Sequence, residues 1–343
     1  MNTPPAAGWQ QRVLHEDDAT RIDYFVQSRP ARVLAIVFDP LLYLSDRPHF
    51  AQDFLRRMAV DIVAVRRKGE DFYQSLSREA FLAAVQPVLG RYRRVVAYGS
   101  SLGAYAALYF CRDIDCEVVA SSPRVSVHPR YGAKVWQSRV EFRHQPLASA
   151  AQPAPRCRAI VIFDPKEPLD RRYIEGEVLP QFGQAEVLRV PYSGHPSNHF
   201  LAEIGFISPF VRAVVAGTAR PLLDRRQRVR SSTYHQVLAA LCAQRGKPRW
   251  AGALVERSLA LNAKNMLAHR SLGQLRLQQQ RWSDAAAALE AALALSPGDA
   301  LTQSLLKQAR EGSSAAARPA APPRRVHDLR AIAGRLRSWL ERK

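Results

Sequence analysis

The sequence contains no long uncharged apolar segment of the kind that spans a bilayer, so no transmembrane helix is expected. Residues 1–8 show neither a basic n-region nor an apolar h-region, so no signal peptide is expected. Cysteine is scarce: the four residues Cys111, Cys116, Cys157 and Cys242 are scattered and form no C-x-x-C pair. That scarcity argues against a zinc site and a disulfide framework, and it predicts a reducing, cytoplasmic environment.

Acidic residues are also few, with 30 Asp and Glu against 50 Lys and Arg, which gives a formal net charge of +20. This charge favours contact with an anion, whether a nucleic acid, an anionic membrane face or an acidic substrate. No nucleic-acid recognition motif accompanies it, so no specific nucleic-acid partner is expected. No metal site and no organic cofactor are implied by any motif in the chain.

What the chain does contain is an alternation of apolar strands and amphipathic helices over its first two thirds. Eight strands are predicted, at residues 12–16, 21–27, 32–38, 60–65, 94–98, 116–120, 157–163 and 185–190. Helices are predicted at residues 79–92, 171–182 and 198–216 and directly after residue 101. This alternation predicts an α/β fold with a doubly wound, mostly parallel sheet. Ligands of such sheets bind at the carboxyl ends of the strands.

The sequence Gly-Ser-Ser-Leu-Gly at residues 99–103 lies between a predicted strand and a predicted helix. It matches the Gly-x-Ser-x-Gly nucleophile elbow, in which small flanking residues allow a tight turn that exposes the central serine. Ser101 is therefore the predicted nucleophile, and the amide of Leu102 the first oxyanion donor. The second donor should come from the loop after Phe38. Since Pro40 has no N–H, Asp39 or Leu41 must supply it.

A base and an acid are predicted on later loops, because the elbow fold orders its residues as Ser, acid, His. His195 follows the strand at residues 185–190 and is the predicted base, with His199 as its rival. Asp164 directly ends the strand at residues 157–163 and is preferred as the acid. Glu167, in a Glu-Pro-Leu sequence, stays open as the alternative, and Asp170 is expected to cap the following helix.

Residues 10–216 resemble a compact α/β hydrolase. The segments at residues 99–105, 122–129, 164–172 and 194–196 are similar to those of bacterial hydrolase-like proteins associated with surface polysaccharides. The resemblance implies a serine-esterase or acyl-transfer mechanism acting on an ester substrate. An alternative hypothesis from another class is a non-catalytic scaffold that uses the fold as a platform.

Several arginines follow strands or the predicted acid loop, at the sheet edge that would carry Ser101. They are Arg66, Arg67, Arg124, Arg171 and Arg172. Because guanidinium groups match carboxylate and phosphate geometry, these residues predict an anionic substrate, such as an acidic or phosphate-linked carbohydrate.

The last third of the chain changes to Ala- and Leu-rich sequence. Leu-Ala-Leu-Asn at residues 259–262 recurs as Leu-Ala-Leu-Ser at residues 293–296, a period of 34 residues that is typical of tetratricopeptide repeats. The predicted organisation is an α/β-hydrolase domain at 1–218, a basic linker at 219–231, an all-α helical-repeat domain at 232–311, a flexible linker at 312–324 and a basic amphipathic helix at 325–343.

Two partners follow from this organisation. The helical repeats predict a bound protein partner. The C-terminal helix, with apolar residues at helical spacing and arginines between them, either caps the repeats or lies peripherally on the inner face of the membrane.

Overall fold

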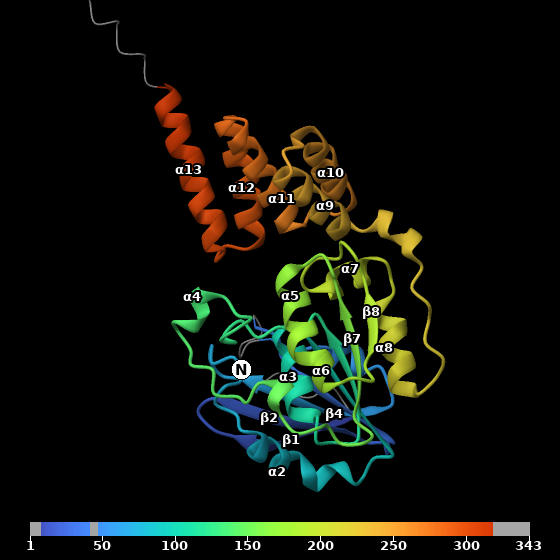
Figure 1. Ribbon diagram of the computed structural model, residues 1–343. Helices are drawn as coiled ribbons and strands as arrows, with labels where there is room; N and C mark the ends of the chain where they lie inside the picture. The colour runs from blue at the N-terminus through green and yellow to red at the C-terminus, as the bar shows by residue number, and fades with distance from the viewer. Residues whose placement is uncertain (1–7, 42–46, 318–343) are drawn as a thin grey trace, which may run out of the picture. The chain divides into compact units, whose positions relative to one another are not determined.

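The computed structural model describes residues 8–41 and 47–317 (Figure 1). The chain divides into two compact units, residues 1–265 and residues 266–343. The predicted fold class is confirmed: a mostly parallel α/β sheet comes first, and helical repeats follow it. The predicted amphipathic helix at 325–343 and most of the linker before it lie outside the described residues.

All eight predicted strands are present, and they form one sheet in the order β1-β2-β4-β3-β5-β6-β7-β8. β2 pairs antiparallel with β1 and with β4, whereas the remaining neighbours are parallel. The strands are β1 Trp9–Glu16, β2 Thr20–Gln27, β3 Val33–Phe38, β4 Val60–Arg67, β5 Arg94–Ser100, β6 Glu117–Ser121, β7 Arg158–Phe163 and β8 Glu186–Arg189.

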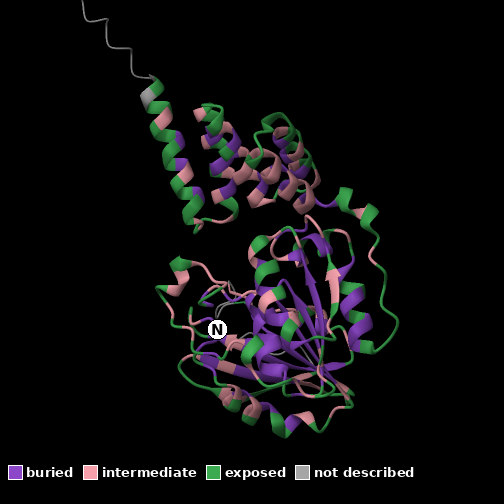
Figure 2. Cartoon of the chain, viewed as in Figure 1, coloured by how far each residue is buried: buried purple, intermediate pink, exposed green. Residues whose placement is uncertain are grey.

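The central strands are buried on both faces (Figure 2). In β3, Ile36 and Phe38 face one core, whereas Ala35 and Val37 face the other, as the two-residue period of a strand requires. This double burial explains why the central strands read as continuous apolar runs in the sequence.

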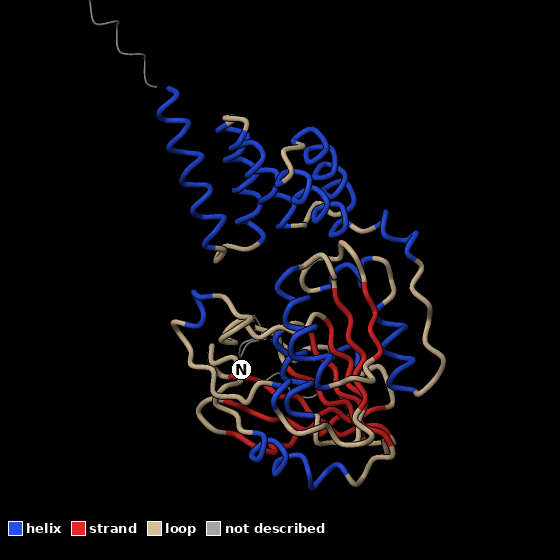
Figure 3. The backbone as a smooth tube through the Cα atoms, viewed as in Figure 1, coloured by secondary structure: helices blue, strands red, loops and turns tan. Residues whose placement is uncertain are grey.

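Helices cover both faces of the sheet (Figure 3). They are α1 Gln52–Leu55, α2 Arg78–Leu89, α3 Leu102–Cys111, α4 Lys134–Gln137, α5 Pro168–Tyr173, α6 Leu179–Gln181, α7 Ser197–Glu203 and α8 Ile207–Ala216. The single helix predicted at 198–216 is two helices, because Gly205 adopts a φ of +72° between them. No single described helix is long and apolar enough to cross a membrane; α7 and α8 satisfy that test only as a pair, bent by 100°.

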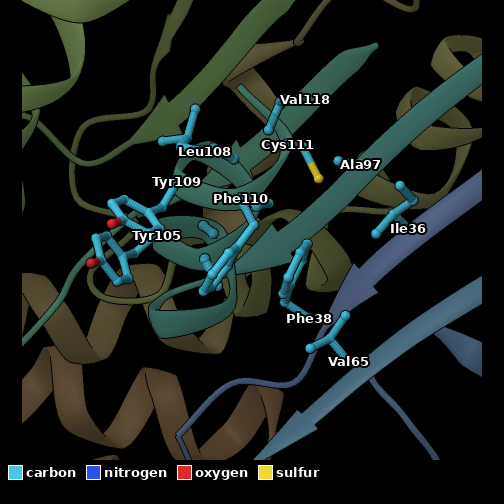
Figure 4. Packing of buried hydrophobic residues seen from close by; sticks show 14 of the residues in the cluster. Ile36, Phe38, Val65, Ala97, Tyr105, Leu108, Tyr109, Phe110, Cys111 and Val118 are labelled. Carbon is cyan, nitrogen blue, oxygen red and sulfur yellow. The ribbon is translucent and has the colours of Figure 1, made fainter. Parts of the chain in front are cut away.

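Helix α3 is buried along its whole length, so its residues form the centre of one core. Phe110 of α3 stacks on Phe38 of β3 with ring centroids 5.8 Å apart. Tyr105 and Tyr109 stack beside it at 5.8 Å (Figure 4). The contact between Phe110 and Phe38 packs the helix that begins at the predicted elbow against β3.

The helices of the last third are α9 Ser232–Gln244, α10 Pro248–Leu261, α11 Met266–Gln278, α12 Trp282–Leu295 and α13 Ala300–Ala317. The boundary between the compact units falls after Asn265, so α9 and α10 belong with the sheet. In the second unit, α11 packs on α12 so closely that a Cβ on Gly273 would lie 2.5 Å from Leu289 Cγ. Gly273 therefore allows the two helices to cross closely.

Residues 312–317, predicted as the start of the flexible linker, are helical. Helix α13 continues to Ala317, because alanine favours helix and Gly312 packs directly on the Trp282 ring, where a Cβ would lie 2.5 Å from the ring.

Two glycines allow α3 to approach β3 and β5. A Cβ on Gly99 would lie 2.2 Å from the Gly103 carbonyl oxygen, and a Cβ on Gly103 would lie 2.2 Å from the Phe38 carbonyl oxygen. Both obstacles are backbone atoms, which cannot move aside without displacing a strand or the helix.

We therefore expect Gly103→Ala to lower the free energy of unfolding by about 3 kcal/mol, as overpacking in a tight core does. Gly183→Ala is the matched control, since no atom lies within 4 Å of its Cβ position, and it should change stability by less than about 0.5 kcal/mol. Urea unfolding of the α/β unit measures both. Equal effects of the two substitutions would contradict the close approach.

Candidate functional site

Ser101 occupies the turn between β5 and α3 with φ 55° and ψ −119°, a conformation that is strained for a residue with a side chain. Its N–H donates to the Ser121 carbonyl at 2.9 Å, and its own carbonyl accepts from Ala104 and Tyr105 at 3.1 Å each. These bonds and the flanking glycines maintain the strained backbone. The Oγ atom lies 2.8 Å from Nε2 of His195.

His195 lies in the loop that follows β8. Its Nδ1 atom is 2.8 Å from Oδ2 of Asp170. A carboxylate at Nδ1 favours the tautomer with the proton on that nitrogen, which leaves Nε2 free to accept the Ser101 hydroxyl proton. His199, the rival in the sequence, is exposed in α7.

The carboxylate that contacts His195 is that of Asp170. The prediction that Asp164 or Glu167 occupies this position is therefore wrong. The loop after β7 is short enough that α5 begins at Pro168. Asp170 therefore lies in the first turn of α5, fully buried, with its carboxylate turned toward the histidine loop instead of capping the helix.

The two predicted acids have other contacts. Asp164 accepts hydrogen bonds from the Lys166 and Gly194 amides at 2.8 and 2.9 Å, so it ties the histidine loop to the end of β7. Burial raises the pKa of Asp164 above its ordinary value, although these amide donors oppose the shift. Glu167 accepts from Nη2 of Arg124 at 3.0 Å.

The amides predicted to bind the oxyanion differ in whether their N–H groups are free to do so. Leu102 is the first residue of α3, where an amide has no acceptor inside its own helix and the helix dipole favours negative charge. Asp39 cannot be the second donor, since its N–H donates to the Val65 carbonyl at 3.1 Å. Leu41 therefore stays the predicted second donor.

These residues share one edge of the sheet. Ser101, Asp170 and His195 follow β5, β7 and β8, at the carboxyl ends of parallel strands, and they occur along the chain in the order Ser, Asp, His. Three features together define one fold: a sheet whose second strand runs antiparallel, a strained serine between a strand and a helix, and the order Ser, Asp, His along the chain. The fold is that of the α/β hydrolases.

Two solved structures are similar to part of this chain. Dienelactone hydrolase from Anabaena variabilis is 12% identical and matches 62% of this chain and 100% of its own, with a TM-score of 0.41. Est1E from Butyrivibrio proteoclasticus is 12% identical over 61% of this chain and 100% of its own, at 0.39.

Another solved structure is similar to a different part of the chain, the C-terminal helices. The MamA protein is 21% identical over 25% of this chain, with a TM-score of 0.25, and the chain spans only 47% of that protein's length. No protein-family model matches the sequence, and no curated protein matches it significantly.

Three of the five arginines predicted to bind substrate, Arg66, Arg67 and Arg124, instead contact other residues of the first compact unit. Arg66 donates to Oδ2 of Asp39 at 2.8 Å. Arg67 is fully buried and donates to the carbonyls of Gly69 and Leu41 at 2.8 and 2.9 Å. These bonds hold the loop after β3, so the prediction that Arg66 and Arg67 bind substrate is not supported by their contacts.

Arg124 forms an ion pair with the acid that contacts His195: its Nη2 lies 2.7 Å from Oδ1 of Asp170. The sequence did not reveal this ion pair, because it depends on how two distant loops meet. Arg171 and Arg172 are exposed on α5, and Arg171 lies 3.9 Å from Glu175. Only these two of the five remain available to a substrate.

Helix α9 packs on the histidine loop. A Cβ on Gly194 would lie 2.9 Å from Cγ2 of Val237, and the rings of Tyr192 and Tyr234 meet edge to face at 6.3 Å. Glu203 at the end of α7 accepts from the Thr233 amide at 2.9 Å, at the start of α9. The first predicted repeat thus supports the loop that carries His195, a contact that the repeat pattern could not indicate.

A buried histidine supports the loop after β3. His49 Nδ1 is 3.0 Å from Asp39 Oδ2, and its Nε2 is 3.4 Å from Asp23 Oδ2. Burial alone would lower the pKa of His49, but the two carboxylates outweigh burial and raise it above 6.5. In the described residues, no cluster of His, Cys, Asp and Glu is arranged to hold a metal ion.

We expect His49→Gln to lower the free energy of unfolding by about 2 kcal/mol near pH 5.5, where the imidazolium is bound to charged partners. Because the folded pKa is raised, this stabilisation is complete below the unfolded value and is lost as pH rises through the folded value. The gap between wild type and variant should therefore shrink toward about pH 9. Urea unfolding across this pH range measures it, and a gap that widens with pH would contradict the ion pairs.

Proposed function

We propose that this protein is a serine hydrolase that cleaves or transfers an ester-linked acyl group, with Ser101, His195 and Asp170 as its catalytic triad. The observation that carries the proposal is the pair of 2.8 Å contacts that join the strained Ser101 to His195 and His195 to Asp170. A strained serine aligned with an oriented base is the arrangement that nucleophilic catalysis needs.

In the proposed reaction Ser101 Oγ attacks the ester carbonyl carbon while Nε2 of His195 takes the hydroxyl proton. The carbonyl oxygen becomes an oxyanion, which the amide of Leu102 and a donor from the loop after β3 stabilise. The alcohol leaves with the proton from His195. Water or a sugar hydroxyl then attacks the acyl-enzyme, His195 takes its proton, and Ser101 is released with the proton restored.

Asp170 stabilises the imidazolium that forms in each step. It is fully buried, so its charge is expensive unless it is paired. Arg124 supplies that pairing, and its second contact, to Glu167, fixes the guanidinium in place. Arg124 is therefore a positioning residue for the triad.

The substrate proposed is an ester, with an anionic carbohydrate as the preferred acyl carrier. Arg171 and Arg172 support this preference, because both are exposed on α5 and directly follow the proposed acid Asp170. A soluble ester of an acidic sugar meets both requirements, a reactive carbonyl and an anionic group that guanidinium binds.

The alternative is a non-catalytic scaffold that binds a protein partner through the helical repeats. Trp250 of α10 is 68% exposed and would suit such a contact. The strain at Ser101 favours the enzyme, because a platform gains nothing from a strained backbone and strain of this kind gathers at functional sites.

We expect Ser101→Ala to abolish hydrolysis of a small chromogenic ester while the protein stays folded, because the proposed acyl-enzyme forms on the hydroxyl that is removed. Ser100→Ala is the matched control, since it removes a neighbouring hydroxyl in β5, and it should retain most of the activity. Steady-state kinetics measure both. Wild-type rates in the Ser101→Ala protein would exclude the proposed nucleophile.

We expect Asp170→Asn to lower kcat by about a thousandfold with a small effect on KM, because the amide cannot hold the required imidazole tautomer. Glu167→Gln changes the charge three residues away and should cost less than about tenfold. If Glu167→Gln or Asp164→Asn proved the more damaging change in kcat, Asp170 would not be the triad acid.

A further inference from the structure

A cavity of about 470 Å³ opens at the amino ends of β5, β6 and β7, next to the end of α8. Its wall contains five arginines, namely Arg93, Arg94, Arg156, Arg158 and Arg220. Two carboxylates, those of Asp115 and Glu117, share the wall, so the lining carries an excess of three positive charges.

Two of the five arginines already have acidic partners. Arg94 pairs with Glu117 and donates to the Val214 carbonyl at 2.9 Å. Arg220 lies 2.7 Å from Glu186 and 3.8 Å from Glu117. Glu117 is thus shared between two guanidinium groups and adds no surplus negative charge to the cavity.

The other three arginines, less the charge of Asp115 on the same wall, leave an excess of two positive charges once the pair of Arg220 with Glu186 is counted. Within the described part of the chain, no carboxylate lies within ion-pairing distance of Arg93, Arg156 or Arg158. Arg158 is opposite Glu117 in the pairing of β6 with β7, Arg156 lies two residues before it, and Arg93 directly precedes β5. The sheet itself therefore brings three like charges to one rim, at an energetic cost that a bound anion would remove.

The position of the cavity separates it from the proposed active site. Ser101 follows the carboxyl end of β5, and Arg93 precedes its amino end. Seven residues of extended strand lie between them, about 20 Å of chain. A ligand here therefore does not contact the Ser101 hydroxyl.

We propose that this cavity binds a small soluble molecule that carries a diphosphate group. Guanidinium groups bind phosphate oxygens in pairs of parallel hydrogen bonds, and a net excess of two positive charges matches the two to three negative charges of a diphosphate. The site is a concave cavity larger than the diphosphate itself, so it has room for an attached group. A flat basic surface would instead suit a polymer or a membrane.

The test is calorimetric titration of the full-length protein with inorganic pyrophosphate. The Arg156→Ser/Arg158→Ser variant should bind at least tenfold more weakly, a loss of about 1.4 kcal/mol for each tenfold. Both side chains are exposed, so the variant should keep the wild-type melting temperature. Raising NaCl from about 50 to about 500 mM should weaken wild-type binding, because salt screens charge attraction.

Two controls make the result specific. Arg245→Ser/Arg249→Ser removes the same charge from an exposed turn and the start of α10, away from the cavity lining and from the proposed active site, and should leave the affinity unchanged. Ser101→Ala should also bind pyrophosphate normally, so the outcome is independent of the proposed catalysis. No binding by the wild type at millimolar pyrophosphate, or equal weakening in both arginine variants, would overturn the proposal.

Discussion

The close approach of α3 to the sheet is the constraint on which the proposed site depends. Gly99 and Gly103 have backbone carbonyl oxygens 2.2 Å from where a side chain would begin, so only glycine allows the helix to start directly after β5. The turn this forces gives Ser101 a positive φ. The Ser101 hydroxyl therefore faces the neighbouring loops. The residues of α3 that follow it are all buried in the core.

Around that turn, three loops are held by contacts that differ in kind. The histidine loop is tied to β7 by Asp164 and supported from the other side by α9. The acid is fixed by Arg124, which bridges Asp170 and Glu167. The loop after β3 is held by Arg66, Arg67 and His49. Charged side chains thus do most of the positioning, which accounts for part of the basic composition in structural terms.

The sequence predicted what depends on local pattern. The later strands could be read from apolar runs and the first two from the turn between them, and Ser101 could be read from the spacing of two glycines, because a tight turn limits the residues beside it. The histidine followed from its place after the eighth strand. The acid could not be read, because the choice between residues 164, 167 and 170 depends on where α5 begins and which way its first turn faces.

The roles of the arginines and the limits of the units were also beyond the sequence. Position at a sheet edge does not tell whether a guanidinium faces a substrate or an internal carboxylate, as Arg66 and Arg124 show. Similarly, the 34-residue repeat groups α9 and α10 with the later helices, whereas their packing groups them with the sheet up to Asn265. Both outcomes depend on contacts between segments far apart in the chain.

The central claim is that Ser101 is an activated nucleophile. The most direct measurement is to treat the purified protein with a fluorophosphonate, digest it and locate the adduct by mass spectrometry of the peptides. We expect one phosphonyl group on Ser101, formed in the native protein and not after unfolding, because activation needs His195 beside the hydroxyl. An adduct on another residue, or the absence of any adduct on the folded protein, would contradict it.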